Sequence, residues 1–305
     1  MKPFLWGLAL GLTLMGTAPA VASPLAEAVL VLEDRARDRR VEVLLIHPIG
    51  AEEAPLVVFS PGFLFSGPAY RSWAELFAAH GMATALLSYA YSLFNPDHRL
   101  LVQDLLFALE GLPKEAARRG VPLDGKRVAL VGHSLGGKLS VLGAAEREVV
   151  AVVGLDPVDG GAPGVVDPVR FPSAVVALGA VKAPLLLIGA EYGERTRFGM
   201  PCAPPEANFR RFFAAARGPA LEITQLGAGH LDYLDNPDCG FLCSLCWPGS
   251  RPDAARAWAQ TYALLFLRRH LFGEGPAYSE LLALLARQEA EGLVRFRQKP
   301  ENPGP

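Results

Sequence analysis

The sequence has no excess of charge of either sign. Its 29 lysine and arginine residues nearly balance 31 aspartates and glutamates, which gives a formal net charge of −2 over 305 residues. Because there is no basic excess, nucleic acid is not an expected partner, and no acidic run suggests a disordered tail. With 51% hydrophobic residues, the chain has enough apolar side chains for the core of one large domain.

Long apolar runs are also missing, except at the start. After residue 23 no uninterrupted apolar stretch reaches about 18 residues, so no membrane span is expected in the mature protein. Residues 1–23 combine a basic start at Lys2, an apolar segment over Phe4–Met15 and the A-x-A-like sites Ala18-Pro19-Ala20 and Ala20-Val21-Ala22. We expect a cleaved signal peptide and a secreted or periplasmic protein. An uncleaved N-terminal anchor is the alternative.

Cysteine is scarce, and its placement is uneven. The four cysteines are Cys202, Cys239, Cys243 and Cys246, and the last three share a loop rich in proline and glycine. An even number in an exported protein indicates disulfides. Three pairings are possible, and we favour a bond from Cys202 into the late cluster because closing a longer loop restricts the unfolded chain more. A zinc site is disfavoured because the spacing lacks two C-x-x-C pairs, and no metal or other cofactor is expected.

Segments with strand and helix character alternate along the rest of the chain. Strands are expected at Val41–Ile46, Leu56–Ser60, Ala83–Tyr89, Val128–Val131, Val149–Leu155, Pro184–Ile188 and Ala220–Gln225. Helices are expected at Ala69–His80, Arg99–Arg119, from Lys138 to Arg147, at Glu206–Arg217 and at Ala254–His270. This order predicts an α/β protein with a mostly parallel central sheet and helices on both faces. We assign the domain to residues 24–295 and expect a flexible tail over 296–305.

Residues 127–137 read RVALVGHSLGG and contain a G-x-S-x-G pentapeptide centred on Ser134. An apolar strand precedes the serine, and a helix is expected to follow it. A serine on such a strand-to-helix turn has its hydroxyl exposed above the sheet, with glycines relieving the crowding on either side. Ser134 is therefore the predicted nucleophile, and an idle serine in a glycine-rich turn is the alternative.

A serine hydroxyl needs a base, and His230 is the best candidate among the six histidines. It follows the strand Ala220–Gln225 in the loop LGAGHLDYLDN, just before the closing helix. His80 and His270 close helices, where a cation favours the helix dipole. His133 adjoins the serine, and its side chain is expected to point away.

The histidine in turn needs a carboxylate to hold its tautomer. Asp156 ends the strand that follows the serine, and a carboxylate there is costly unless it is paired. Asp159, Glu191 and Glu194 are the alternatives. The chain order serine, aspartate, histidine is the one expected for an α/β-hydrolase.

The developing oxyanion needs backbone N–H donors. Leu135, directly after the serine, is expected to supply one, and Phe63, in the loop after LVVFS, the other. Leu64, Phe65, Tyr91 and Phe94 are candidate substrate contacts because apolar and aromatic side chains suit a hydrophobic ester.

With these residues identified, the chain resembles the chlorophyllases, α/β-hydrolases that cleave the phytyl ester of chlorophyll. The resemblance is most specific in VVGLDPVDG (152–160), PCAPPEANFRRFF (201–213), GHLDYLDN (229–236) and the late cysteine loop. It implies the triad Ser134, Asp156 and His230. The chain departs from the plant pattern at Leu135, where arginine is typical, and at Pro61-Gly62, where histidine–glycine is usual.

The resemblance and the motifs together imply an exported serine esterase that acts on a hydrophobic ester such as that of chlorophyll. A lipase or polyester-type esterase, or a catalytically silent binding protein on the same fold, is the alternative.

Overall fold

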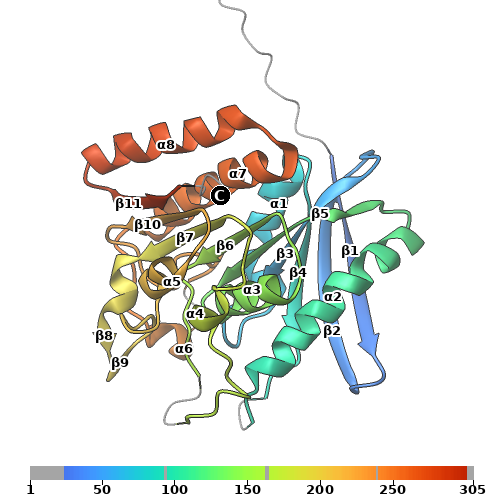
Figure 1. Cartoon of the computed structure of the whole chain (residues 1–305), viewed down its shortest axis with the longest axis horizontal. Helices are drawn as coiled ribbons and strands as arrows, with labels where there is room; N and C mark the ends of the chain where they lie inside the picture. Colours follow the sequence, from blue (N-terminus) through green and yellow to red (C-terminus); the bar gives the residue numbers. More distant parts are fainter. Residues whose placement is uncertain (1–23, 93–94, 162–164, 238–239, 301–305) are drawn as a thin grey trace, which may run out of the picture.

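The computed structural model describes residues 24–92, 95–161, 165–237 and 240–300. Within these residues, nine strands form one sheet in the order β1-β2-β4-β3-β5-β6-β7-β10-β11. The strands from β4 to β10 run parallel, and antiparallel pairs lie at both edges. Helices cover both faces (Figure 1). The predicted α/β-hydrolase architecture is confirmed.

The strands of the sheet are β1 (Leu25–Asp34), β2 (Arg39–Pro48), β3 (Ala54–Ser60), β4 (Ala83–Tyr89), β5 (Leu123–His133), β6 (Ala151–Leu155), β7 (Leu185–Ala190), β10 (Ala220–Gln225) and β11 (Val294–Lys299). The α-helices are α1 (Arg71–Ala79), α2 (His98–Arg118), α3 (Leu135–Glu146), α4 (Ala174–Ala177), α5 (Phe209–Ala215), α6 (Phe241–Ser244), α7 (Pro252–Phe272) and α8 (Gly275–Ala290). Two 3₁₀ turns, Gly67–Tyr70 and Glu191–Glu194, and the short pair β8 (Thr196–Arg197) and β9 (Met200–Pro201) complete the described elements.

Each face of the sheet has its own hydrophobic core. On one face the core includes Leu105 of α2, Leu139 of α3 and Phe212 of α5, all fully buried. On the other it includes Trp73 of α1 and Tyr262 of α7. The central strands β3, β6 and β7 are buried along their whole length, which is why they read as continuous apolar runs.

The sheet is wider than the sequence patterns predict. β1 was not expected, although Leu30 and Leu32 alternate with the exposed Val29 and Val31 as in an edge strand. The chain also continues past the expected last helix into α8 and then β11, which pairs antiparallel with β10. The expected flexible tail is therefore wrong over residues 296–299, because main-chain pairing holds a segment that lacks a clear pattern. No helix in the described ranges is long and apolar enough to cross a bilayer.

The parallel strands bring the predicted site residues to one edge of the sheet. Ser134 directly follows β5, and Asp156 directly follows β6, its neighbour in the sheet. His230 lies five residues after β10, and Phe63 three residues after β3. Ligand sites of open parallel sheets lie at this edge, outside the carboxyl ends of the strands.

Candidate active site

Ser134 occupies a sharp turn between β5 and α3. Its backbone has φ 53° and ψ −117°, a strained conformation for a residue with a side chain, and its N–H donates to the carbonyl of Leu155. A Cβ atom at Gly136 would lie 2.0 Å from the Ser60 carbonyl oxygen, and one at Gly132 would lie 2.1 Å from that of Gly136. Both positions thus require glycine, and the turn can present the serine hydroxyl above the strand ends.

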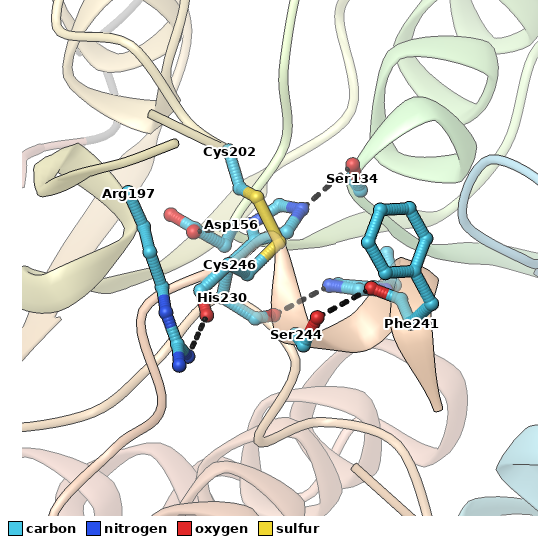
Figure 2. The surroundings of a disulfide bond; sticks show 9 residues. Ser134, Asp156, Arg197, Cys202, His230, Phe241, Ser244 and Cys246 are labelled. Carbon is cyan, nitrogen blue, oxygen red and sulfur yellow. Dashed lines mark hydrogen bonds and ion pairs between the residues drawn. A yellow bond between two sulfur atoms is a disulfide. The ribbon is translucent and has the colours of Figure 1, made fainter. Parts of the chain in front are cut away.

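The structure brings Ser134, His230 and Asp156 into one hydrogen-bonded chain (Figure 2). Ser134 Oγ lies 2.9 Å from His230 Nε2, and His230 Nδ1 lies 2.7 Å from Asp156 Oδ2. Asp156 is fully buried, and its other oxygen accepts from the Ala190 N–H at 3.2 Å. This geometry lets the histidine accept the serine proton while the carboxylate holds the opposite ring nitrogen.

The competing acidic residues are engaged elsewhere. Asp159 accepts hydrogen bonds from Ser173 and from the N-terminal amides of α4. Glu191 accepts from the Gly227 N–H, and Glu194 binds Asn208 and Arg210. Of the four acidic candidates, Asp156 is the one that the structure places within hydrogen-bond distance of His230.

Burial raises the pKa of Asp156 above its ordinary value, because it disfavours the charged form of the carboxyl group. The hydrogen bond and charge of His230 act in the opposite direction. Glu194 adds a smaller upward effect by charge repulsion. The carboxylate thus depends on His230 for its stabilisation, as His230 depends on the carboxylate for its orientation.

A tight turn after β3 faces the serine. Its residue Leu64 has φ 65°, and the Phe65 N–H donates to the Gly62 carbonyl at 3.1 Å. In the described part of the chain, the Phe63 and Leu135 amides donate no hydrogen bond. Two free N–H groups beside a candidate nucleophile can hold the negative oxygen of a tetrahedral intermediate.

A pocket of about 460 Å³ opens beside Ser134 and His230. Its walls include two of the predicted substrate contacts, Leu64 and Phe65. The pocket wall also includes Leu231 and Leu245, which the sequence analysis missed because each lies in an irregular loop. The lining is mainly apolar, so the pocket suits a hydrophobic ester group.

The other two predicted substrate contacts are Tyr91, which does not line this pocket, and Phe94. Tyr91 lines a neighbouring pocket of about 270 Å³ with Tyr89 and the residues of the Phe63 turn. Its ring meets that of Phe63 edge to face, with centroids 4.9 Å apart. Phe94 lies outside the residues that the structure describes.

A disulfide joins Cys202 to Cys246 and forms part of the pocket wall (Figure 2). This pairing agrees with the favoured bond from Cys202 into the late cluster, and it excludes a zinc site built on all four cysteines. Cys243 is also disulfide-bonded, whereas Cys239 lies outside the described residues. Arg197 donates to the Cys246 carbonyl at 3.2 Å, which fixes the same segment from the side.

The sequence analysis expected the His133 side chain to point away from the site. The structure places it against His230 instead. Its fully buried ring lies 4.8 Å from that of His230 between centroids, and its Nε2 lies 2.8 Å from the His230 carbonyl oxygen. Burial holds the pKa of His133 well below its usual value. The expectation was wrong because a histidine that ends an otherwise apolar strand must find polar partners.

Asp232 also takes part in the site, and the sequence analysis missed it. The buried carboxylate accepts from the Gly229 N–H at 2.9 Å and from the Gly249 N–H at 3.3 Å. It thereby links the loop that carries His230 to the segment after the disulfide. The signal was the acidic residue two positions after the histidine in GHLDYLDN.

Comparison with known proteins identifies the family. A family model described as chlorophyllase matches residues 30–290, which is most of the chain. The chain belongs to the chlorophyllase family. Chlorophyllase-2 of Arabidopsis thaliana is 28% identical over 256 residues, covering 76% of this chain and 78% of that protein. Chlorophyllase-1 of the same plant is 26% identical, covering 74% and 75%.

A solved structure of similar shape supports the fold. The ferulic acid esterase from Streptomyces cinnamoneus superimposes with a TM-score of 0.67, covering 92% of this chain and 98% of the esterase at 23% identity. Family membership and the geometry around Ser134 together make this chlorophyllase-family protein a serine ester hydrolase.

Proposed function

We propose that the protein is an exported esterase that cleaves a hydrophobic carboxylic ester, such as the phytyl ester of chlorophyll, through an acyl-enzyme on Ser134. The observation that carries this proposal is the Ser134–His230–Asp156 chain at the mouth of an apolar pocket. The family supports ester hydrolysis, and the names of the plant relatives suggest the substrate class.

The arrangement supports the following reaction. His230 Nδ1–H donates to Asp156, so Nε2 is free to accept the Ser134 proton as Oγ attacks the ester carbonyl carbon. The negative oxygen that forms is bound by the Phe63 and Leu135 N–H groups. His230 then returns the proton to the leaving alcohol, and the acyl group remains on Ser134. Water, activated by the same histidine, releases the acid.

The pocket supports a hydrophobic alcohol or acyl group. No charged carboxylate, lysine or arginine is among its described lining residues, and the side chains of Phe63, Leu64 and Leu231 face it. Phe63 and Leu64 are 44% and 37% exposed although they are apolar, so the pocket has a hydrophobic rim. Leu135 stands where plant members typically carry arginine, so the acid part of the substrate here need not match theirs.

Export is supported by the composition of residues 1–23, which lie outside the described residues, and by the disulfide. Disulfides persist in oxidising compartments and are rare in the cytosol. N-terminal sequencing of the protein from cell-free medium or periplasm should find cleavage near Ala20 or Ala22. An intact Met1 on a cell-associated protein would contradict export.

A panel of esters tests the activity and the substrate separately. We expect the purified enzyme to cleave p-nitrophenyl butyrate and octanoate. We also expect it to release chlorophyllide from chlorophyll a, which chromatography would detect. Ser134→Ala should retain the fold and lose all these activities. Turnover by folded Ser134→Ala would contradict the chemistry, and cleavage of the p-nitrophenyl esters without chlorophyll would contradict only the substrate.

A further inference from the structure

A second chain of hydrogen bonds runs behind the triad through fully buried groups. The Gly62 N–H donates to the Tyr70 hydroxyl at 3.0 Å, and this hydroxyl lies 2.8 Å from His133 Nδ1. His133 Nε2 in turn lies 2.8 Å from the main-chain oxygen of His230. Tyr70 and His133 have no exposed surface.

The partners at the two ends determine where each proton lies. A carbonyl oxygen only accepts, so His133 Nε2 must carry a proton toward His230. Burial lowers the pKa of His133, the ring is neutral, and Nδ1 is therefore the acceptor. The Tyr70 hydroxyl must then donate to Nδ1, and its lone pair accepts from Gly62. Burial also raises the pKa of Tyr70, so the hydroxyl keeps its proton.

The chain connects the two parts of the site that must stay aligned during the reaction. Gly62 immediately precedes Phe63, whose N–H is the proposed oxyanion donor, and His230 is the proposed base. The fit at Gly62 is close: a Cβ atom there would lie 2.9 Å from His133 Nδ1 and 3.2 Å from the Tyr70 hydroxyl. Even a methyl group would push these partners apart.

We propose that Tyr70 and His133 are positioning residues that hold the oxyanion turn and the catalytic histidine at a fixed separation. This inference rests on the proposed function, because it assigns the two residues to the reaction at Ser134. The hydrogen bonds of the two side chains go to Gly62, to each other and to the main chain of His230, and not to Ser134 Oγ. His133 acts through the main chain of His230, and Tyr70 acts through His133 and the main chain of Gly62. A neutral His133 also places no second positive charge beside the His230 ring when that ring takes the serine proton.

Kinetics of three variants test the inference. Tyr70→Phe removes the hydroxyl with both of its hydrogen bonds, to Gly62 and to His133, and should lower kcat about tenfold. His133→Phe keeps a ring but breaks both bonds and should lower kcat about 100-fold, as expected when a catalytic group is misplaced by about 1 Å. For Tyr70→Phe, KM should stay within about twofold, because Tyr70 does not line the pocket beside Ser134.

The matched control is Tyr262→Phe. Tyr262 is another fully buried tyrosine, and its hydroxyl binds Gln288 of α8. Its loss should lower the melting temperature as Tyr70→Phe does, but leave kcat within about twofold of the wild type because the bond is structural. Equal kcat values for Tyr70→Phe and Tyr262→Phe would overturn the proposal.

The protonation state of His133 gives a readout that does not depend on turnover. Long-range ¹H–¹⁵N spectra of the ring should show a neutral imidazole with the proton on Nε2 from pH 7 down to pH 5.5. A protonated ring, or a proton on Nδ1, would overturn the proposed chain even if the enzyme is active. Conversely, an expected spectrum with full turnover by Ser134→Ala would show that the proposed function had failed and not the hydrogen-bond chain.

Discussion

Asp156 and Asp159 follow the same strand three residues apart, yet they serve opposite sides of the site. Asp156 turns toward His230, whose loop is linked through Asp232 to the segment that follows Cys246 of the disulfide. Asp159 turns toward α3 and α4, where it accepts from Ser173 Oγ at 2.6 Å and lies 3.4 Å from Lys138 Nζ. We call these the histidine side and the helix side.

The two sides use a buried carboxylate for different purposes. On the histidine side the Cys202–Cys246 bond fixes the neighbouring pocket wall, and the Asp156 carboxylate orients a histidine ring that changes its charge during the reaction. On the helix side the Asp159 carboxylate itself holds the structure together, because it pairs with the buried ammonium group of Lys138. Lys138 is 1% exposed and also donates to the Gly160 carbonyl. We therefore expect substitutions on the histidine side to lower the activity and substitutions on the helix side to lower the stability.

The largest effect is expected at Asp156. Asp156→Asn should lower kcat about 10⁴-fold, because the amide favours the wrong histidine tautomer, while the protein stays folded. Steady-state kinetics with circular dichroism on the same sample would check this. Glu191→Gln and Glu194→Gln are the controls and should change kcat little. A large loss at either glutamate with a nearly wild-type Asp156→Asn would reverse the assignment.

The same substitution at Asp159 should act on stability. Asp159→Asn leaves the Lys138 ammonium buried without its counter-charge and should lower the free energy of unfolding by about 3–5 kcal/mol. Urea unfolding gives the value, and kcat of the folded fraction should change less than tenfold. Asp253→Asn is the control, because the Asp253 carboxylate that pairs with Arg256 is exposed to solvent, and such a pair is worth under about 1 kcal/mol. Equal effects at both aspartates would remove the distinction between the two sides.

Breaking the disulfide tests the histidine side without touching the triad. Replacing Cys202 and Cys246 by serine opens a loop with a sequence separation of 44 and should cost about 2–4 kcal/mol of stability. Because the bond forms part of the pocket wall, kcat/KM should fall as well. Thermal melts and kinetics with and without reductant would follow both. Unchanged kcat/KM in the folded double variant would show that the wall does not need the bond.

The triad could be predicted from the sequence because each member has a local signal at a strand end. Ser134 has its glycines, Asp156 follows an apolar strand, and His230 lies in a glycine-containing loop. The roles of Tyr70 and His133 could not, because they depend on contacts between segments far apart in the chain. Tyr70 alone reads as a helix residue, and nothing nearby shows that it meets His133.

The outer strands of the sheet show the same limit. β1 carries an alternating pattern that can be recognised afterwards, but β11 reads VRFRQK and has only a weak one. It is a strand because the edge of β10 offers unpaired main-chain groups, and pairing satisfies them. Patterns of side chains do not report this requirement of the main chain.

The smallest effect is the loss of stability that we expect when the pH is lowered and His98, near the helix side, becomes protonated in the unfolded chain. His98 opens α2, is 6% exposed, and meets Phe171 edge to face. Burial lowers its pKa to about 4 from an ordinary value of 6.5. In the unfolded chain His98 is protonated near pH 6.5, whereas in the folded protein it is protonated only near pH 4. The stability of the folded protein therefore falls as the pH falls through this range.

His98→Phe removes this proton uptake and keeps a ring against Phe171. Between pH 7.5 and pH 5 the wild type should lose about 2 kcal/mol more stability than the variant. Urea unfolding at the two pH values gives the difference, in which the other titrating groups cancel. The same loss in both proteins would show that His98 titrates normally in the folded state.

The central claim is that Ser134 is the nucleophile that becomes acylated. The most direct measurement is intact-protein and peptide mass spectrometry after treatment with a fluorophosphonate and, in a separate sample, with a slowly hydrolysed p-nitrophenyl ester. We predict one adduct per chain, located on the peptide that contains Ser134, slower labelling of Asp156→Asn and none of Ser134→Ala. An adduct on another residue, or equal labelling of folded Ser134→Ala, would contradict the claim.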